Sequence, residues 1–254
     1  MFTKAITRIP ARSFANGLTT SKLGNPDYDL MLQQHYKYVE ALVNLGLEVT
    51  QLEPFNDFPD AHFVEDVAVV TNEIGVITNP GAPERNGEKF FIKAPLSKFR
   101  DLEFIESPGT LDGGDVLQIG KHFFIGISER TNEEGANQLA SILKKFGYTF
   151  TNVKVGPGLH FKSSVNYVGK NSILITDHFF SNPIFDAYNK ILVDKDEEYA
   201  ANSLFINDTI LTPKGYPKTK AKLSKLDFPI IELDMSEVQK MDGGLTCLSI
   251  RFAG

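Results

Sequence analysis

The sequence contains a single cysteine and no tryptophan among its 254 residues. One cysteine cannot form an intrachain disulfide, and it excludes a zinc site built mainly from cysteines. Because disulfides mark oxidising compartments, their exclusion favours a cytoplasmic location. No apolar run approaches the ~20 residues needed to span a bilayer, so we expect no membrane partner.

The charged residues lack long blocks of one sign. The 26 basic and 32 acidic residues give a formal net charge of -6. Nucleic acids are bound through concentrated Lys and Arg, so we expect no nucleic-acid partner. All the charged residues before Asp27 are basic, as in mitochondrial targeting segments. They include Lys4, Arg8 and Arg12. However, Pro10 interrupts the helix that such a segment needs.

Four hairpin-like segments recur along the chain, each with two apolar or alternating runs around a short turn. Their starts lie ~40 to 50 residues apart, which indicates an internal repeat. The predicted hairpins span residues 67–78, 115–128, 165–176 and 203–212, and a final strand spans residues 246–252.

Helices are predicted between the hairpins. The clearest begins after Pro26 and ends before Gly46, which suits a left-handed cap. A second helix opens at Thr131, with Glu134 in capping-box spacing, and a third begins near Pro217. The apolar face of the first helix would carry Leu32, Tyr36, Val39 and Val43.

The repeating unit is therefore hairpin, helix, strand, or ββαβ. Units that cannot bury their apolar faces alone must stack or close. About five units without a long linker favour closure into a pseudo-fivefold ring, one domain over residues 1–254. For residues 183–193 the sequence is compatible with either a short helix or a strand. The strands after the three helices are predicted at residues 47–52, 148–153 and 230–233.

Polar residues stand just before the hairpins, at matching points of the repeat, and closure would bring them into one central pocket. Cys247 is a candidate nucleophile, since a nearby imidazole or a cationic substrate can lower the pKa of a thiol. His160 could protonate a leaving amine and then activate water, with Asp112 orienting its ring.

Three further acids would add negative charge suited to a planar guanidinium: Glu65, Asp66 and Asp60. Taken singly, the candidates have simpler roles, because lone cysteines are mostly inert and Asp-Gly-Gly segments form turns. Their shared position in the repeat favours the catalytic interpretation. A zinc-dependent alternative stays open, since Cys247, His160 and Asp112 are competent ligands.

A series of motifs runs in order along the chain: Pro-Ala-Arg-Ser (10–13), Gly-Leu-Thr (17–19), Phe-Val-Glu-Asp (63–66), Thr-Leu-Asp-Gly-Gly-Asp (110–115), Arg-Thr-Asn (130–132), Gly-Leu-His (158–160), Tyr-Ala-Ala-Asn (199–202), Gly-Tyr-Pro (215–217) and Asp-Gly-Gly (242–244) before Cys247. In this order the motifs resemble the dimethylarginine dimethylaminohydrolases of the pentein, or amidinotransferase, superfamily. The resemblance covers essentially the whole chain.

The resemblance implies a five-bladed pseudosymmetric α/β propeller of ββαβ units with a central site. It implies hydrolysis of asymmetric dimethylarginine or monomethylarginine to citrulline and a methylamine, with no cofactor and no metal. Cys247 would form a covalent thiouronium intermediate, with His160 as general acid and base and Asp112 as its orienting carboxylate. Residues 14–24 would close over the site. The implied substrate-binding residues are Leu18, Asp60, Glu65, Asp66, Arg85, Arg130, Met241 and Asp242, of which the two arginines would hold the substrate carboxylate.

Two positions depart from the family pattern. Leu248 follows the nucleophile where some relatives carry a second cysteine, and Met241 is longer than the branched residues expected there. Arginine deiminase is a rival within the same chemistry, but such enzymes resemble longer chains with an arginine where Glu65 stands. A non-catalytic module of the same fold is the alternative outside enzymes. The sequence leaves the oligomeric state open, a homodimer being one option.

Overall fold

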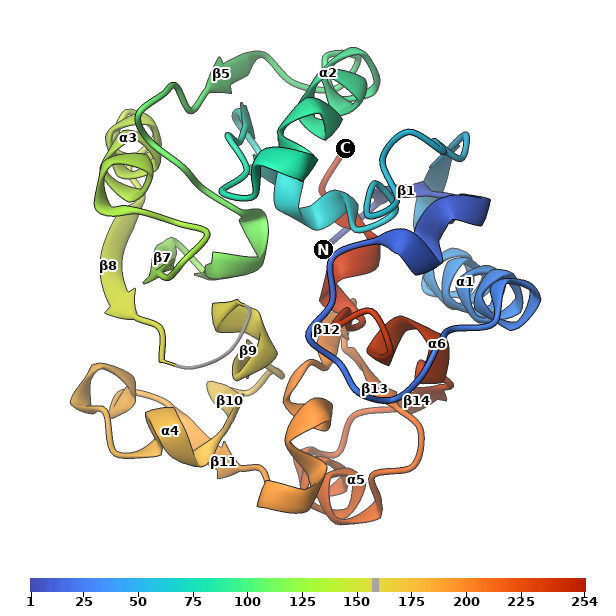
Figure 1. Cartoon of the computed structure of the whole chain (residues 1–254). Helices are drawn as coiled ribbons and strands as arrows, with labels where there is room; N and C mark the ends of the chain where they lie inside the picture. The colour runs from blue at the N-terminus through green and yellow to red at the C-terminus, as the bar shows by residue number, and fades with distance from the viewer. Residues whose placement is uncertain (157–159) are drawn as a thin grey trace.

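A computed structural model of the chain describes residues 1–156 and 160–254. These described residues form five three-stranded sheets arranged around a central axis, with the helices outside them (Figure 1). In every sheet the central strand pairs antiparallel with one neighbour and parallel with the other. The architecture is the five-bladed α/β propeller that the sequence predicts.

The four predicted hairpins are confirmed. In the β12–β13 hairpin, Asn207 and Asp208 have φ angles of 47° and 61°, which suits a tight turn between antiparallel strands. The third strand of each of these sheets returns in parallel after a helix or turn. The four sheets are β3 (Ala68–Val70), β4 (Gly75–Ile77) and β5 (Leu102–Phe104); β6 (Val116–Ile119), β7 (His122–Ile127) and β8 (Thr149–Lys154); β9 (Val165–Tyr167), β10 (Ser172–Ile175) and β11 (Asn189–Leu192); β12 (Leu204–Ile206), β13 (Thr209–Pro213) and β14 (Ile230–Leu233).

The fifth sheet joins the two ends of the chain. It consists of β15 (Ile250–Phe252), β1 (Lys4–Arg8) and β2 (Glu48–Leu52), with β1 in the centre. The sequence analysis did not predict β1. Cleavage of an N-terminal targeting segment would remove this central strand from the sheet. The predicted final strand is too long, because Thr246–Leu248 form a 3-10 turn in which the Thr246 N–H bonds to a side chain of another unit.

Helix α1 (Tyr28–Asn44) lies where it was predicted, with Gly46 at a φ of 86° after it. Its predicted inner face is wrong by part of a turn, since Tyr36 and Val43 are 52% and 53% exposed. The polar Asp27 side chain, rather than the proline, caps its N-terminus. The buried residues are Met31, Gln34, His35, Tyr38, Val39, Ala41 and Leu42.

The remaining helices are shorter. Helix α3 (Glu133–Lys144) is capped by Asn132 instead of the predicted Thr131, whose hydroxyl bonds to Asp115. Helix α5 (Pro217–Leu223) continues into a 3-10 turn. Residues 183–193 contain both predicted alternatives, a 3-10 turn at Pro183–Phe185 and then β11. Three further helices are α2 (Phe90–Leu96), α4 (Asp177–Phe180) and α6 (Ser236–Gln239).

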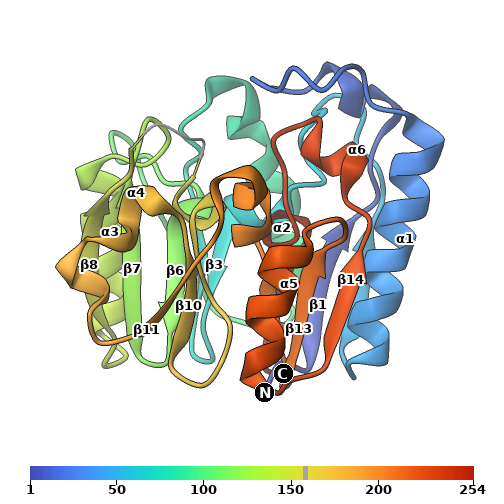
Figure 2. The ribbon, with the colours of Figure 1, turned by 90° about the horizontal axis from the view of Figure 1, so that it is seen from below.

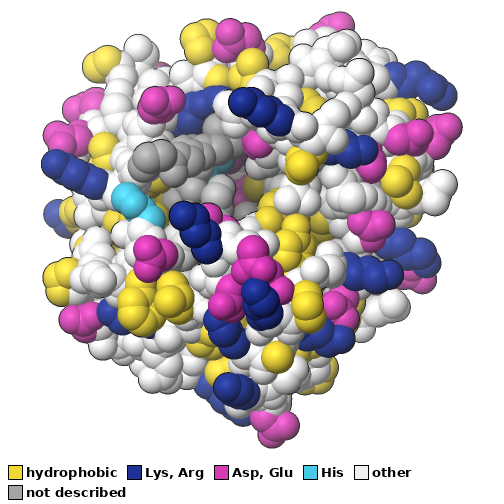
Figure 3. Space-filling model, turned by 60° about the horizontal axis from the view of Figure 1, so that its bottom comes forward, with side chains coloured by type: hydrophobic (Ala, Val, Ile, Leu, Met, Phe, Trp, Pro, Cys, Tyr) yellow, Lys and Arg dark blue, Asp and Glu magenta, His cyan; other side chains and the backbone are white. Residues whose placement is uncertain are grey.

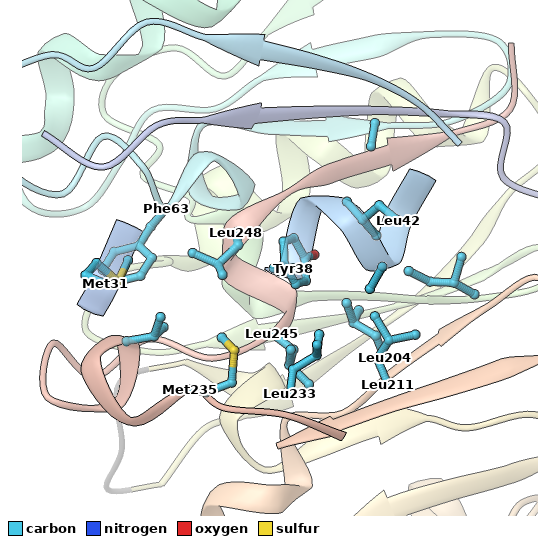
Figure 4. Packing of buried hydrophobic residues seen from close by; sticks show 14 of the residues in the cluster. Met31, Tyr38, Leu42, Phe63, Leu204, Leu211, Leu233, Met235, Leu245 and Leu248 are labelled. Carbon is cyan, nitrogen blue, oxygen red and sulfur yellow. The ribbon is translucent and has the colours of Figure 1, made fainter. Parts of the chain in front are cut away.

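The apolar core is divided among the units. The cluster drawn in Figure 4 fills the space between α1, the neighbouring strands and the C-terminal turn, and includes Tyr38, Leu42, Phe63 and Leu248.

Charges of both signs are interspersed on the face in Figure 3. Among the described residues, no helix has both the length and the apolar character of a membrane span. Seen from the side, both chain ends lie at the end of the ring away from α6 (Figure 2).

Candidate active site

Four 3-10 turns meet at the centre of the ring, each just before the first strand or the last strand of a unit. They are Val64–Val67, Gly113–Asp115, Phe161–Ser163 and Thr246–Leu248, and they contact one another in a chain. Neighbouring residues in these turns face opposite ends of the ring. Asp66 and Cys247 line a small cavity, whereas Glu65 and Thr246 line a larger one of ≈ 690 Å³.

The small cavity collects most of the residues that the resemblance implies. Its volume is ≈ 20 Å³, room for about one water molecule. Asp112 and Glu65 do not line it. Phe63 and Gly243, which the sequence reasoning did not select, do line it. The implied residues in its lining are Leu18, Asp60, Asp66, Arg85, Arg130, His160, Met241, Asp242 and Cys247.

Asp112 lies behind His160, away from the cavity. The Nε2 atom of His160 is 2.9 Å from Oδ2 of Asp112. The other oxygen, Oδ1, accepts the backbone N–H of Gly81 at 2.9 Å, so the carboxylate is fixed at both ends. Asp112 is fully buried. This geometry suits a carboxylate that orients an imidazole.

Charge around His160 favours its protonated form. Burial alone lowers the pKa of His160, but the carboxylates of Asp66, Asp112 and Asp115 outweigh it and raise the pKa to about 9. Gly114 lies against the ring, since a Cβ there would be 2.7 Å from Nδ1 of His160. At neutral pH the side chain is therefore an imidazolium, a form that can donate a proton.

Asp66 and Arg85 form a buried ion pair at the cavity wall. Nη1 of Arg85 is 2.5 Å from Oδ2 of Asp66, and the Gly114 N–H donates to Oδ1 at 2.9 Å. Burial raises the pKa of Asp66, but the positive charges of His160 and Arg85 outweigh burial and lower the pKa to about 2. Asp66 is thus an anion in contact with the cavity.

The guanidinium of Arg85 has little capacity left for a substrate carboxylate. Its Nε and Nη2 atoms donate to the two oxygens of Glu88 at 3.0 and 2.7 Å, and Nη2 also reaches the Phe63 carbonyl at 3.1 Å. By contrast, the side chain of Arg130 makes no hydrogen bond with the described residues. The sequence analysis did not select Glu88, which lies one helical turn after Arg85.

Cys247 is half-buried in the last of the central turns. Its Sγ accepts the N–H of Gly244 at 3.4 Å. Burial, together with the negative charges of Glu65 and Asp66, raises the pKa of Cys247 to about 12. The free site therefore holds a neutral thiol beside a protonated imidazole.

Glu65 belongs to the opposite side of the central turns. Its Oε1 atom is 2.6 Å from Nζ of Lys162 and 3.2 Å from Nη2 of Arg251, and all three side chains line the larger cavity. In this arrangement Glu65 acts on Cys247 through its charge, because it does not contact the small cavity.

The segment after Gly17 closes over the small cavity. The N–H of Leu18 donates to Asp60 at 2.9 Å. The hydroxyl of Thr19 donates to Asp242 at 3.1 Å, and the N–H and hydroxyl of Thr20 donate to the same oxygen. Figure 1 shows this N-terminal segment passing close to α6. These bonds hold the segment beside the cavity, whose lining includes Leu18.

Asp66, Asp112 and His160 also bring three possible ligand atoms within 4.8 Å of one another. Their oxygens already accept hydrogen bonds from Arg85, Gly114 and Gly81. Nε2 of His160 is also already bonded to Asp112, so the group suits proton transfer better than metal binding. The possible zinc ligands named from the sequence were Cys247, His160 and Asp112. The structure instead groups Asp66 with His160 and Asp112.

Comparisons with known proteins agree with this fold. A family model described as arginine deiminase matches residues 33–159. The N(G),N(G)-dimethylarginine dimethylaminohydrolase of Pseudomonas aeruginosa is 42% identical over 254 residues, 99% of this chain and 100% of the relative. The protein of the same name from Streptomyces coelicolor is 33% identical over 98% of this chain and 96% of its own.

A solved structure gives the same result. The Pseudomonas aeruginosa enzyme, as a cysteine-to-serine mutant complexed with citrulline, superposes with a TM-score of 0.98 at 42% identity, covering 99% of this chain and 100% of that one. Fold and relatives together define a hydrolase of the pentein superfamily. Within it, the chain belongs to the dimethylarginine dimethylaminohydrolase family.

One motif is only partly described. Of Gly-Leu-His at residues 158–160, only His160 lies within the described residues.

Proposed function

We propose that the chain, acting as one catalytic domain over residues 1–254, hydrolyses asymmetric dimethylarginine or monomethylarginine to citrulline and a methylamine. The observation that carries the proposal is the cavity shared by Cys247, His160 and Asp66. A nucleophile, a proton donor and an anion for the substrate cation are the three groups that this reaction needs.

Substrate binding would activate the thiol. With a pKa of about 12, Cys247 is almost entirely protonated at neutral pH. A guanidinium held by Asp66 and Asp60 brings positive charge to the sulfur and offsets the negative neighbours that raise this pKa. The thiol proton then leaves to solvent, because His160 already carries its own. A cationic substrate is therefore part of the machinery that makes the thiolate.

The first half of the reaction breaks the carbon–nitrogen bond. The Cys247 thiolate adds its electron pair to the guanidinium carbon. His160 donates its proton to the departing dimethylamine nitrogen, and a thiouronium remains on the sulfur. His160 is left neutral, still oriented by Asp112.

The second half releases citrulline. Neutral His160 takes a proton from a water molecule as its oxygen adds to the thiouronium carbon. The carbon–sulfur bond then breaks and its electron pair returns to Cys247. The oxygen stays on the carbon as the ureido carbonyl, and its remaining proton passes to the sulfur and restores the neutral thiol. His160 regains the imidazolium with which the cycle began.

The lining of the same cavity supports roles for the other implied residues. Arg130, whose side chain has no bond to the described residues, would hold the substrate carboxylate. Met241 and Phe63 supply apolar wall beside Cys247, which suits the methyl groups. Leu18 lies on the closing segment, and Asp242 accepts hydrogen bonds from that segment. The segment would open for substrate entry and exclude water while the intermediate exists.

Product analysis tests the proposal against arginine deiminase activity. The protein is incubated with dimethylarginine, monomethylarginine or arginine, and citrulline is measured with the amine released. We expect citrulline with dimethylamine or methylamine, and little ammonia from arginine. Cys247→Ser should keep the fold and lose turnover; unchanged turnover in that variant would contradict the mechanism.

Two further parts of the proposal concern the setting. The single cysteine supports a cytoplasmic location, which localisation of a tagged chain would test. We also propose that the chain forms a homodimer. Light scattering at several concentrations distinguishes a homodimer from a monomer.

A further inference from the structure

No step of the reaction above uses the Tyr-Ala-Ala-Asn segment at residues 199–202, yet two of its side chains reach the turn that holds Cys247. The hydroxyl of Tyr199 donates to the Gly243 carbonyl at 3.0 Å. The side-chain oxygen of Asn202 accepts the N–H of Thr246 at 2.9 Å, and its nitrogen donates to the Thr246 hydroxyl at 3.1 Å. Both polar atoms of this amide are thus bonded to the residue before the nucleophile.

The same amide reaches the turn that follows His160. Nδ2 of Asn202 donates to the carbonyl oxygen of Lys162 at 3.2 Å. That carbonyl also accepts from Nδ2 of Asn166 at 2.6 Å. Asn202 therefore connects the turn of the nucleophile with the turn of the acid and base.

Packing leaves Asn202 little freedom. Its side chain is buried, at 6% exposure, and a Cβ on Gly244 would lie 2.4 Å from its Cγ. Only glycine at 244 allows this approach. Because the Gly244 N–H also contacts the sulfur of Cys247, a displaced Asn202 would disturb both the position and the hydrogen bond of the thiol.

We propose that Asn202 is a positioning residue, which fixes the sulfur of Cys247 relative to the imidazole of His160 by joining their two turns. The inference rests on the proposed function, since it takes these two residues as the reacting pair. A shift of ~1 Å between reacting groups can slow a reaction by ~100-fold. Arg130 and Asp60 make no bond to Asn202, so substrate binding should change little.

Asn202→Ala tests the inference through two readouts. For dimethylarginine we expect kcat to fall ~10- to 100-fold while KM stays within ~3-fold. Alkylation of Cys247 by iodoacetamide should become slower at a fixed pH, because a shifted turn weakens the hydrogen bond from the Gly244 N–H to the sulfur and so raises the pKa of the thiol. The matched control is Asn207→Gly, which removes side-chain bonds to backbone groups outside these two turns. Glycine tolerates the φ of 47° at this position, so the control should keep kcat.

A second pair of variants decides the question if Asn202→Ala does not fold. Thr246→Val keeps the shape and removes the hydroxyl that Asn202 binds, whereas Thr246→Ser keeps the hydroxyl. We expect a lower kcat in the first and near wild-type kcat in the second. Because that hydroxyl also lies 3.9 Å from Sγ of Cys247, Asn202→Asp is measured beside them. It keeps the oxygen that accepts the Thr246 N–H and loses the amide donor, so its kcat should also fall. A wild-type kcat in Thr246→Val, or in folded Asn202→Ala, would overturn the inference.

The alkylation rates keep this test separate from the proposed function. If the wild-type protein did not turn over dimethylarginine, the proposed function would fail. The same variants would still report on Asn202, because the reaction of Cys247 with iodoacetamide needs no substrate. Unchanged alkylation profiles in Asn202→Ala and Thr246→Val would then count against the inference.

Discussion

Oδ2 of Asp112 lies 2.9 Å from Nε2 of His160, although 48 residues separate the two in the chain. The contact exists because the turns before β6 and β9 meet at the centre of the ring. His160 lines the cavity, whereas Asp112 does not. The carboxylate therefore acts only through the histidine.

Asp112→Asn should lower kcat by ~10²- to 10⁴-fold, the range in which such orienting and proton-transfer groups act. The neutral amide lacks the negative charge with which Asp112 stabilises the imidazolium, so the pKa of His160 should fall from about 9. NMR titration of the ring protons measures this fall. An unaltered titration with full activity would rule out the orienting role.

Glu65→Gln tests whether Glu65 acts by charge from behind the central turns. Removing a negative neighbour should lower the pKa of Cys247 from about 12, so alkylation at neutral pH should become faster. KM for dimethylarginine should change by less than ~3-fold, because Glu65 does not line the small cavity. A large rise in KM instead would indicate direct contact with the substrate.

The two arginines should respond differently to substitution by methionine. Arg130→Met should raise KM by ~10- to 100-fold, the scale of a lost hydrogen bond to a charged group, with little change in stability. Arg85→Met should destabilise the fold by about 3–5 kcal/mol, because it leaves the buried carboxylates of Asp66 and Glu88 without their cation. Kinetics combined with urea denaturation separates the two effects.

The protonation of His160 should make folding stability depend on pH. Its pKa is about 9 in the folded chain against 6.5 for the ordinary group. The stabilisation is therefore complete below pH ~6.5 and is lost as pH rises toward ~9, by about 3 kcal/mol in all. The check is the free energy of unfolding at several pH values, where His160→Gln should remove this part of the slope.

Local signals explain why much of the fold could be predicted. Turns such as Asn207-Asp208 require left-handed φ angles that few residues tolerate, so they mark hairpins directly. Strand β1 escaped prediction because its antiparallel partner β15 lies at the other end of the sequence, so no hairpin turn marks it. The inner face of α1 was misplaced because it buries the polar Gln34 and His35 and exposes Tyr36 and Val43.

The candidate site was predictable as a set of residues but not as a geometry. Repeat position alone pointed to Cys247, His160 and Asp112. It could not tell that Glu65 and Asp66, adjacent in sequence, face opposite sides of a turn. The partnership of Arg85 with Glu88 was also missed, because a buried ion pair at this spacing resembles a surface pair on a helix.

The fifth sheet pairs the first strand with the last, and Thr3 donates its N–H to the Phe252 carbonyl at 3.1 Å. Both ends lie away from α6 and the closing segment (Figure 2). A short peptide link between the ends would therefore give a circular chain, which could be reopened at an exposed hairpin tip such as Gly120-Lys121. Such a permuted chain would assemble the same five units in a different order of synthesis.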